Sequence, residues 1–161
     1  VVAALDGDLV IAGPRGRRVV KSSEFFVSYL TTSLRPDELL VEVRLKPATA
    51  TTRSAFVELA RRHGDFALVA VALTLELDDA GACRTARVAL VGVGPGPVRA
   101  VQAERCLTGR VVTGAVIRAA AESAAKEIDP ADDLHATGHY RRRLAAVLVE
   151  DAARQALGLH E

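Results

Sequence analysis

The stretch ELARRHGDFALVAVALTLEL, residues 58–77, sets two arginines, a histidine and an aspartate directly before a nearly unbroken apolar run. The run from residue 68 to 77 predicts a long buried strand. The segment before it has two interpretations. A tight turn requires only a positive φ at Gly64 and an Asp65 side chain that bonds its own backbone. Phe66, which such a turn does not require, indicates instead a strand that begins at the wall of a ligand site.

The segments around this run predict strands first and helices afterwards. We expect strands at 8–20 (two short strands joined by a Gly-Pro-Arg-Gly turn), 39–46, 54–60, 68–77 and 84–92. We expect helices at 98–107, after Thr113, and at 137–157. Sequential strands joined by short turns pair antiparallel, so residues 39–92 should form a meander. The prediction is an α+β fold, with an antiparallel sheet of three to four strands packed against about three C-terminal helices.

Apolar residues at helical spacing predict which helix faces are buried. The segment after Ser22 or Ser23 should form a helical turn with an apolar cluster: Phe25, Phe26, Tyr29 and Leu30. The helix after Thr113 should bury Ile117, Ala120, Ala121, Ala124 and Ile128. The last helix should bury Tyr140, Leu144, Val147, Leu148 and Ala152.

The composition excludes several classes of protein. Twenty-one Lys and Arg against twenty Asp and Glu leave a net charge of +1, and aromatic residues make up only 4%. Neither feature favours nucleic-acid binding. No apolar stretch is long enough for a membrane span and no signal peptide is visible, so we expect a cytoplasmic protein. The chain starts at Val1 and contains no Met, so we interpret it as a fragment, or as a processed or incompletely observed chain.

The two cysteines, Cys83 and Cys106, are too few for an iron–sulfur cluster or a zinc cage. A disulfide between them is one interpretation, and two inert intracellular thiols is the favoured one.

Three further motifs have a structural interpretation that outweighs the functional one. The loop GVGPGPVRA at 92–100 resembles a phosphate loop, but Pro95 and Pro97 remove backbone donors, so a structural turn is favoured. The run 141–143, three arginines, is expected to be a solvated helix face rather than an anion site. His135 and His139 have metal-pair spacing, but they flank an expected helix start. We predict no metal site, and no catalytic residue because no nucleophile constellation is present.

Leu40 is out of phase in its own strand. It lies among Glu42, Arg44 and Lys46 on the face that is otherwise charged. An apolar residue on a polar face, together with the carboxylate and the aromatic ring at 65–66, could line a site for a flat heteroaromatic ligand.

Four motifs occur in an order that resembles a known family: EFFVSYLTTSLRPDELLVEVRL (24–45), SAFVELARRHGDFALVAVALTL (54–75), GVGPGPVRA (92–100) and DDLHATGHYRRRLAAVL (132–148). The chain resembles the FAD-binding medium subunit of molybdenum hydroxylases, most closely that of aerobic carbon monoxide dehydrogenase, and more distantly the flavin segment of xanthine dehydrogenase. The resemblance implies that residues 1–46 are the tail of an FAD-binding domain and residues 50–161 the C-terminal α+β domain. The Gly-rich loops that grip the FAD pyrophosphate in this family lie upstream of the matched segments.

The resemblance also implies site residues. Leu40 matches a leucine that meets the isoalloxazine ring, and Asp65 and Phe66 match a segment near the reactive edge of that ring. Val57 matches a position that is lysine in xanthine dehydrogenases, so here only a packing or backbone contact is implied. Residues 61–63, including His63, resemble structural or subunit-facing positions.

The family implies a function for the assembled enzyme. Electrons would pass from a molybdopterin cofactor on a large subunit, through 2Fe-2S clusters on a small subunit, to FAD and then to an acceptor. A dimer of heterotrimers is expected, and this chain alone should be inactive. The alternative is a non-catalytic subunit-docking and assembly module that does not bind FAD on its own.

Overall fold

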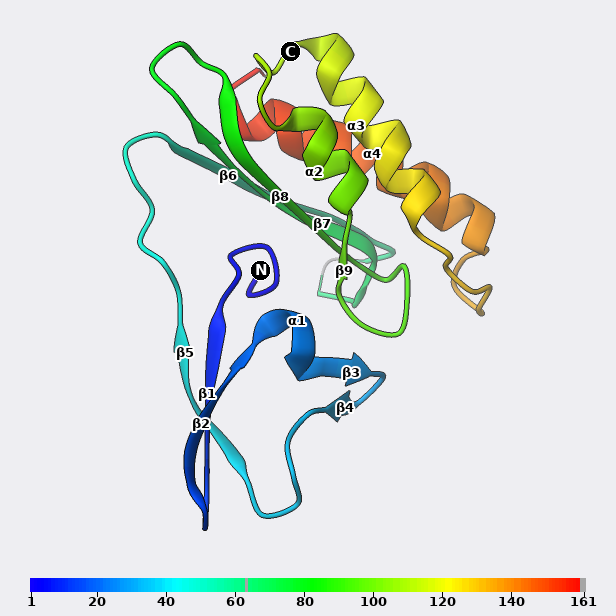
Figure 1. Cartoon of the computed structure of the whole chain (residues 1–161). Helices are drawn as coiled ribbons and strands as arrows, with labels where there is room; N and C mark the ends of the chain where they lie inside the picture. Colours follow the sequence, from blue (N-terminus) through cyan, green and yellow to red (C-terminus); the bar gives the residue numbers. More distant parts are fainter. Residues whose placement is uncertain (63, 160–161) are drawn as a thin grey trace.

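The computed structural model describes residues 1–62 and 64–159 and arranges them in two sheets, a small hairpin and a helical layer (Figure 1). The strands are β1 Asp8–Gly13, β2 Gly16–Lys21, β3 Phe26–Ser28, β4 Thr31–Thr32, β5 Leu39–Arg44, β6 Thr52–Ala60, β7 Ala67–Leu77, β8 Cys83–Val91 and β9 Val98–Arg99. The helices are α1 Ser22–Phe25, α2 Val101–Leu107, α3 Gly114–Glu127 and α4 Gly138–Ala156. The α+β prediction is confirmed.

The first sheet has the order β2-β1-β5, with both pairs antiparallel. The predicted turn between β1 and β2 is present, and Gly16 adopts a φ of +103°, a conformation that glycine alone adopts without steric cost. The core beneath this sheet is small: Leu9, Ile11, Val20 and Phe25.

The helical turn predicted after Ser22 ends after four residues, at Phe25. The chain then forms the hairpin β3–β4, because Val27, Thr31 and Thr32 favour an extended backbone and so short a helix is marginal. Of the predicted apolar cluster only Phe25 is buried, so the prediction is wrong for the other three residues: Phe26, Tyr29 and Leu30 are exposed.

The predicted meander from residue 39 to 92 is wrong at its first strand. β5 pairs with β1, and the antiparallel meander contains β6, β7, β8 and β9 only. The connection 45–51 contains Pro47 and carries the chain from one sheet to the other, so no tight hairpin joins β5 to β6. All six residues of β5 are exposed.

The second sheet has one face under the helices and the other toward the N-terminus (Figure 1). Along β7, the large side chains of 69, 71, 73 and 75 enter the main core, which the helices α2, α3 and α4 complete. Ala70 and Ala72 do not enter that core, and Ala72 packs instead in a small cluster with Ala3 and Ala4 near the N-terminus. Alanines on this face allow the N-terminal segment to approach the sheet closely.

The predicted stripe of α3 is confirmed, since the five predicted residues are buried. The predicted stripe of α4 is wrong for Tyr140 and Val147, which are 46% and 55% exposed. The buried face of α4 consists of Gly138, Arg141, Ala145, Leu148, Val149, Ala152, Ala153 and Ala156. Alanines bring this helix close to the sheet, and the larger side chains at the edge of the face remain outside.

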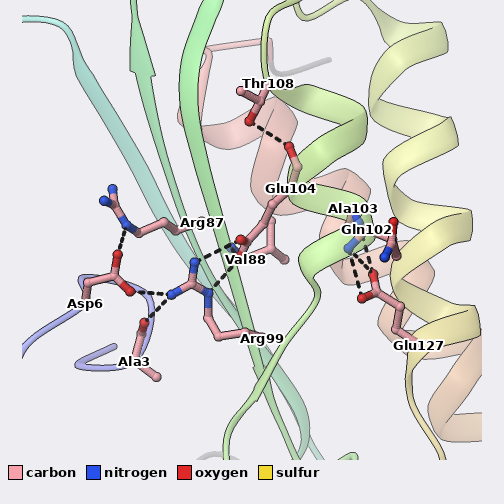
Figure 2. A network of polar contacts seen from close by, with 10 residues as sticks. All are labelled: Ala3, Asp6, Arg87, Val88, Arg99, Gln102, Ala103, Glu104, Thr108 and Glu127. Atoms are coloured by element: carbon pink, nitrogen blue, oxygen red, sulfur yellow. Dashed lines mark hydrogen bonds and ion pairs between the residues drawn. The ribbon is translucent and has the colours of Figure 1, made fainter. Parts of the chain in front are cut away.

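A polar network joins the N-terminal segment to the second sheet and α2 (Figure 2). The Asp6 carboxylate accepts from the guanidinium groups of Arg87 and Arg99. Arg99 also donates to the Ala3 carbonyl at 3.1 Å and to Glu104 Oε1 at 2.6 Å. The two parts of the chain are therefore connected by directed ion pairs as well as by apolar contact.

Candidate functional site

A cavity of about 700 Å³ lies where four segments of the chain meet. Its walls are the β6–β7 turn, the glycine-rich loop after β8, the loop between α3 and α4, and Tyr29 from the tip of the β3–β4 hairpin. We call it the loop pocket. Pockets that bind small organic ligands are about 300–1,000 Å³, so its volume suits a ligand of cofactor size.

The β6–β7 turn contributes Arg61, Asp65 and Phe66 to the loop pocket. Gly64 has the predicted positive φ, and the Asp65 amide donates to the Arg62 carbonyl at 3.2 Å. His63, also predicted to be structural or subunit-facing, lies outside the described residues. The Phe66 side chain is fully exposed at the pocket, 101% of its reference area. The positive φ of the turn interpretation and the exposed aromatic ring of the ligand-site interpretation are therefore both present. Among the described residues, the bond at Asp65 is made by its backbone amide and not by its side chain as predicted.

The glycine-rich loop supplies Gly92 and Gly94 to the pocket wall. Gly92 has a φ of +79°, and a Cβ atom there would lie 2.2 Å from the Leu68 carbonyl oxygen. Only glycine permits this approach of the two backbones. The structural interpretation of the motif is thus supported, and the loop also borders the cavity.

Arg141 is buried beneath the pocket and contradicts the prediction of a solvated arginine face. Its guanidinium donates to the carbonyls of Leu68 and Gly92, the latter at 3.1 Å, and to Asp133 Oδ2 at 2.6 Å. Only 7% of its side chain is exposed. The guanidinium is tolerated there because three acceptors surround it. Arg143 is exposed, as predicted, and Arg142 is half-buried.

Two aspartates, Asp132 and Asp133, organise the part of the α3–α4 loop that borders the pocket. Asp133 accepts from the Arg141 guanidinium and from the amides of Ala136 and His135, and these donors hold the pKa of its carboxyl well below the usual range. Asp132 Oδ1 accepts from the Gly138 amide at 2.6 Å, at the start of α4. Both aspartates line the loop pocket.

His135 and Arg61 both line the pocket and contact each other, with 3.2 Å between the His135 Nδ1 and the Arg61 Nη1. This contact joins the β6–β7 turn to the α3–α4 loop. His139 does not line the pocket, and the described residues contain no group of three His, Cys, Asp or Glu side chains that could hold a metal ion. Neither cysteine forms a disulfide, and burial raises the pKa of the Cys83 thiol to about 11.

Two of the four predicted site residues, the sequence neighbours Asp65 and Phe66, line the loop pocket. Leu40 is 40% exposed in the other sheet, opposite Ile11, and is not among the described residues that line the loop pocket. Val57 is half-buried on β6 and packs against the main core. A contact of Leu40 or Val57 with a ligand stays a prediction.

Sequence reasoning missed Tyr29 and Arg141. Tyr29 was assigned to an apolar cluster, yet it is 70% exposed at the loop pocket. Arg141 had a visible signal: it precedes the buried residues Ala145, Leu148 and Val149 by four, seven and eight positions, which places it on the same helix face. No helix in the described part of the chain is long and apolar enough to cross a membrane.

Comparison with known proteins gives consistent matches along the chain. Residues 54–156 match the CO dehydrogenase flavoprotein C-terminal domain. The chain is 33% identical to 6-hydroxypseudooxynicotine dehydrogenase complex subunit alpha of Paenarthrobacter nicotinovorans, covering 98% of this chain and 53% of that protein. It is 36% identical to caffeine dehydrogenase subunit beta of a Pseudomonas species, covering 97% and 53%.

Solved structures agree. A carbon monoxide dehydrogenase chain from Hydrogenophaga pseudoflava superposes with a TM-score of 0.93 at 32% identity, over 99% of this chain and 55% of that chain. Quinoline 2-oxidoreductase from Pseudomonas putida gives 0.87 at 33% identity, over 98% and 55%. The chain spans about half the length of the curated relatives it matches.

Proposed function

The chain belongs to the family of CO dehydrogenase flavoprotein C-terminal domains, and from this premise we propose that it is the C-terminal part of an FAD-binding electron-transfer subunit. The complete enzyme is a molybdenum hydroxylase in this proposal. Electrons from 2Fe-2S clusters on a small subunit reach FAD on this subunit and leave to an acceptor. The substrate is oxidised at a molybdopterin cofactor on a large subunit, in a cytoplasmic dimer of heterotrimers.

One observation carries the proposal at the level of the site: Phe66, which is fully exposed, and its sequence neighbour Asp65 both line the loop pocket. A bare aromatic face at a cavity of this size fits a planar ring system, because aromatic rings stack favourably. Tyr29 adds a second exposed aromatic ring to the same cavity. The residues present therefore fit the isoalloxazine part of FAD.

Bound FAD supplies the one- and two-electron chemistry, and the protein supplies position and electrostatics. In this proposal Phe66 packs on a face of the ring and keeps water from it. Asp65 places a negative charge nearby, which disfavours the more negative reduced ring and lowers its reduction potential. A contact of Leu40 or Val57 with the ring is implied by the family resemblance alone, since neither is among the described residues that line the loop pocket.

The test uses the whole enzyme complex with Phe66→Ala, and Phe56→Ala as the control. Phe56 is 50% exposed on β6 and does not line the loop pocket, so the control removes a similar exposed ring elsewhere. Loss of a stacking contact of about 1 kcal/mol weakens FAD binding several-fold in Phe66→Ala only. The FAD-to-protein ratio from visible absorbance, during titration of FAD into stripped complex, measures this.

Asp65→Asn tests the electrostatic part in the same complex. Removing the charge should raise the flavin midpoint potential while the FAD content is kept. An unchanged midpoint, together with unaltered FAD binding in Phe66→Ala, would refute the proposed site.

The second candidate function is a docking and assembly module that binds no FAD by itself. The exposed apolar strand β5 favours it, since Leu39 and Val41 are 72% and 47% exposed. The visible absorbance of the purified subunit distinguishes the two functions. A colourless subunit that still co-purifies with the other subunits supports docking, and flavin absorbance supports the electron-transfer function.

A further inference from the structure

We propose that Arg141 is a positioning residue for the loop pocket, which holds three of its walls in register and so fixes where Phe66 and Asp65 stand. The inference rests on the proposed function, because it assigns this residue to the flavin site. Arg141 acts through backbone atoms and one carboxylate, and it is not a catalytic residue.

The first wall that Arg141 holds is the start of β7. The Leu68 carbonyl, which accepts from Arg141 Nη1, lies only two residues after Phe66. A shift of this carbonyl therefore moves the backbone from which the Phe66 ring and the Asp65 carboxylate extend.

The second wall is the glycine-rich loop, held by the bond from the same Nη1 to the Gly92 carbonyl. The β7–β8 ladder ends with the pair Ala70 and Val91, and Gly92 then turns away with a positive φ. Arg141 thus binds two carbonyls just beyond the last rung of the sheet, where the two backbones are so close that only glycine fits. This arrangement fixes the distance between the β6–β7 turn, which carries Phe66, and the glycine-rich loop after β8.

The third wall is the α3–α4 loop, held through Asp133. Its Oδ2 receives Arg141 Nη2 at 2.6 Å, while its Oδ1 receives the amides of His135 and Ala136 at 2.8 Å and 2.9 Å. One carboxylate therefore transmits the position of the guanidinium to the loop that carries His135 to the cavity.

A guanidinium suits this geometry and an ammonium does not. The planar fork of Arg presents several N–H donors in fixed directions, so it reaches two carbonyls and a carboxylate at once. Lysine retains the charge but lacks the fork, so Arg141→Lys separates charge from positioning. Arg142→Lys on the same helix is the matched control, since Arg142 bonds Asp129 and the Ile128 carbonyl and does not line the loop pocket.

The experiment compares FAD affinity and the visible circular dichroism of bound flavin in the whole complex, with thermal melting recorded in parallel. We expect Arg141→Lys to weaken FAD binding about tenfold, the loss of one hydrogen bond from a charged donor, and to change the flavin dichroism. Arg142→Lys should leave both as in the unmodified complex. A lowered melting temperature with unchanged affinity and dichroism would overturn the inference, because it would mean a purely structural arginine.

A second variant keeps the inference testable if Arg141→Lys does not assemble. Asp133→Asn retains Arg141 and loosens one wall, and the Asp133 side chain is 48% exposed, so a stable fold is expected. It should change the flavin dichroism in the same direction with a smaller loss of affinity, and no change in either would overturn the inference.

Phe66→Ala distinguishes the failure of the inference from that of the proposed function. If Phe66→Ala alters the bound flavin and neither Arg141→Lys nor Asp133→Asn does, only the inference about Arg141 fails. If Phe66→Ala also leaves the flavin unaltered, the proposed site itself fails.

Discussion

Two strands of this chain, β7 in the second sheet and β5 in the first, have similar apolar residues but differ in burial. β7 carries Val69, Val71 and Leu73 into a core that three helices close, and these side chains are at most 1% exposed. β5 has the same alternating apolar residues, yet Leu39 is 72% exposed because no described element covers it. The comparison teaches that an apolar alternation indicates a strand but does not decide whether that strand is buried. The difference also predicts where substitutions matter.

The largest effect is expected in the main core. Leu73→Ala removes a buried side chain from the centre of β7 and leaves a cavity, which should lower the free energy of unfolding by about 2–5 kcal/mol. Urea unfolding followed by circular dichroism measures it. A loss below about 1 kcal/mol would contradict the view that this layer holds the fold together.

A smaller effect is expected in the polar network that joins the N-terminal segment to the second sheet and α2. Arg99→Gln breaks the ion pairs to Asp6 and Glu104, and should cost about 2 kcal/mol because Glu104 is left partly buried without its cation. Hydrogen exchange should then show β1 and β2 opening before β7. Arg84→Gln, at an exposed position on β8, is the control and should stay within about 0.5 kcal/mol. Equal protection of both sheets in Arg99→Gln would mean that the network does not couple them.

The first sheet should depend on pH through Glu38. The Arg18 guanidinium and the Arg35 amide donate to its carboxylate and lower its pKa from 4.5 to about 2. Since the folded pKa is the lower one, this stabilisation is complete above pH 4.5 and is lost as the pH falls through about 2. At neutral pH, the rate of amide hydrogen exchange in β1 and β2 should therefore be higher in Glu38→Gln than in the unmodified chain. In acid, where this stabilisation is lost, the two rates should become equal. Glu58→Gln, at an exposed position on β6, is the control and should leave the exchange rates in β1 and β2 unchanged.

The smallest effect is expected on β5. Leu39→Thr keeps strand propensity at an exposed site, so it should change the free energy of unfolding of this chain by less than about 0.5 kcal/mol. The same substitution should also be made in the assembled complex, and its effect on thermal stability compared with that in this chain alone. A clearly larger loss of thermal stability there would mean that another segment or subunit covers β5, and an equal loss would mean that it stays exposed.

Much of the fold was predictable because it depends on local patterns. The turn at Gly16, the strands β6 to β8 and the cap of α3 at Thr113 follow from residue types next to one another in the chain. The errors arose where distant segments compete. β5 was assigned to the meander, but β1, from the start of the chain, takes it as a partner.

The loop pocket was predictable only in part. Phe66 and Asp65 stood out because an aromatic ring and a carboxylate before a buried strand need an explanation. The loop that contains Gly92 is visible in the sequence as a motif, but Gly92 and Asp133 are both remote in sequence from that turn. Only the fold shows that Arg141 connects all three segments. The structure also separates Leu40 from the cavity lining, a placement that no local pattern indicates.

The sequence by itself determined the family, the strand and helix types and the aromatic corner at 65–66, because these depend on motifs and on periodicity along the chain. Tertiary structure decided that Arg141 binds the carbonyls of Leu68 and Gly92, that β5 is exposed and that four segments line one cavity. These are matters of which surfaces meet, and burial depends on what packs against a residue rather than on the residue itself.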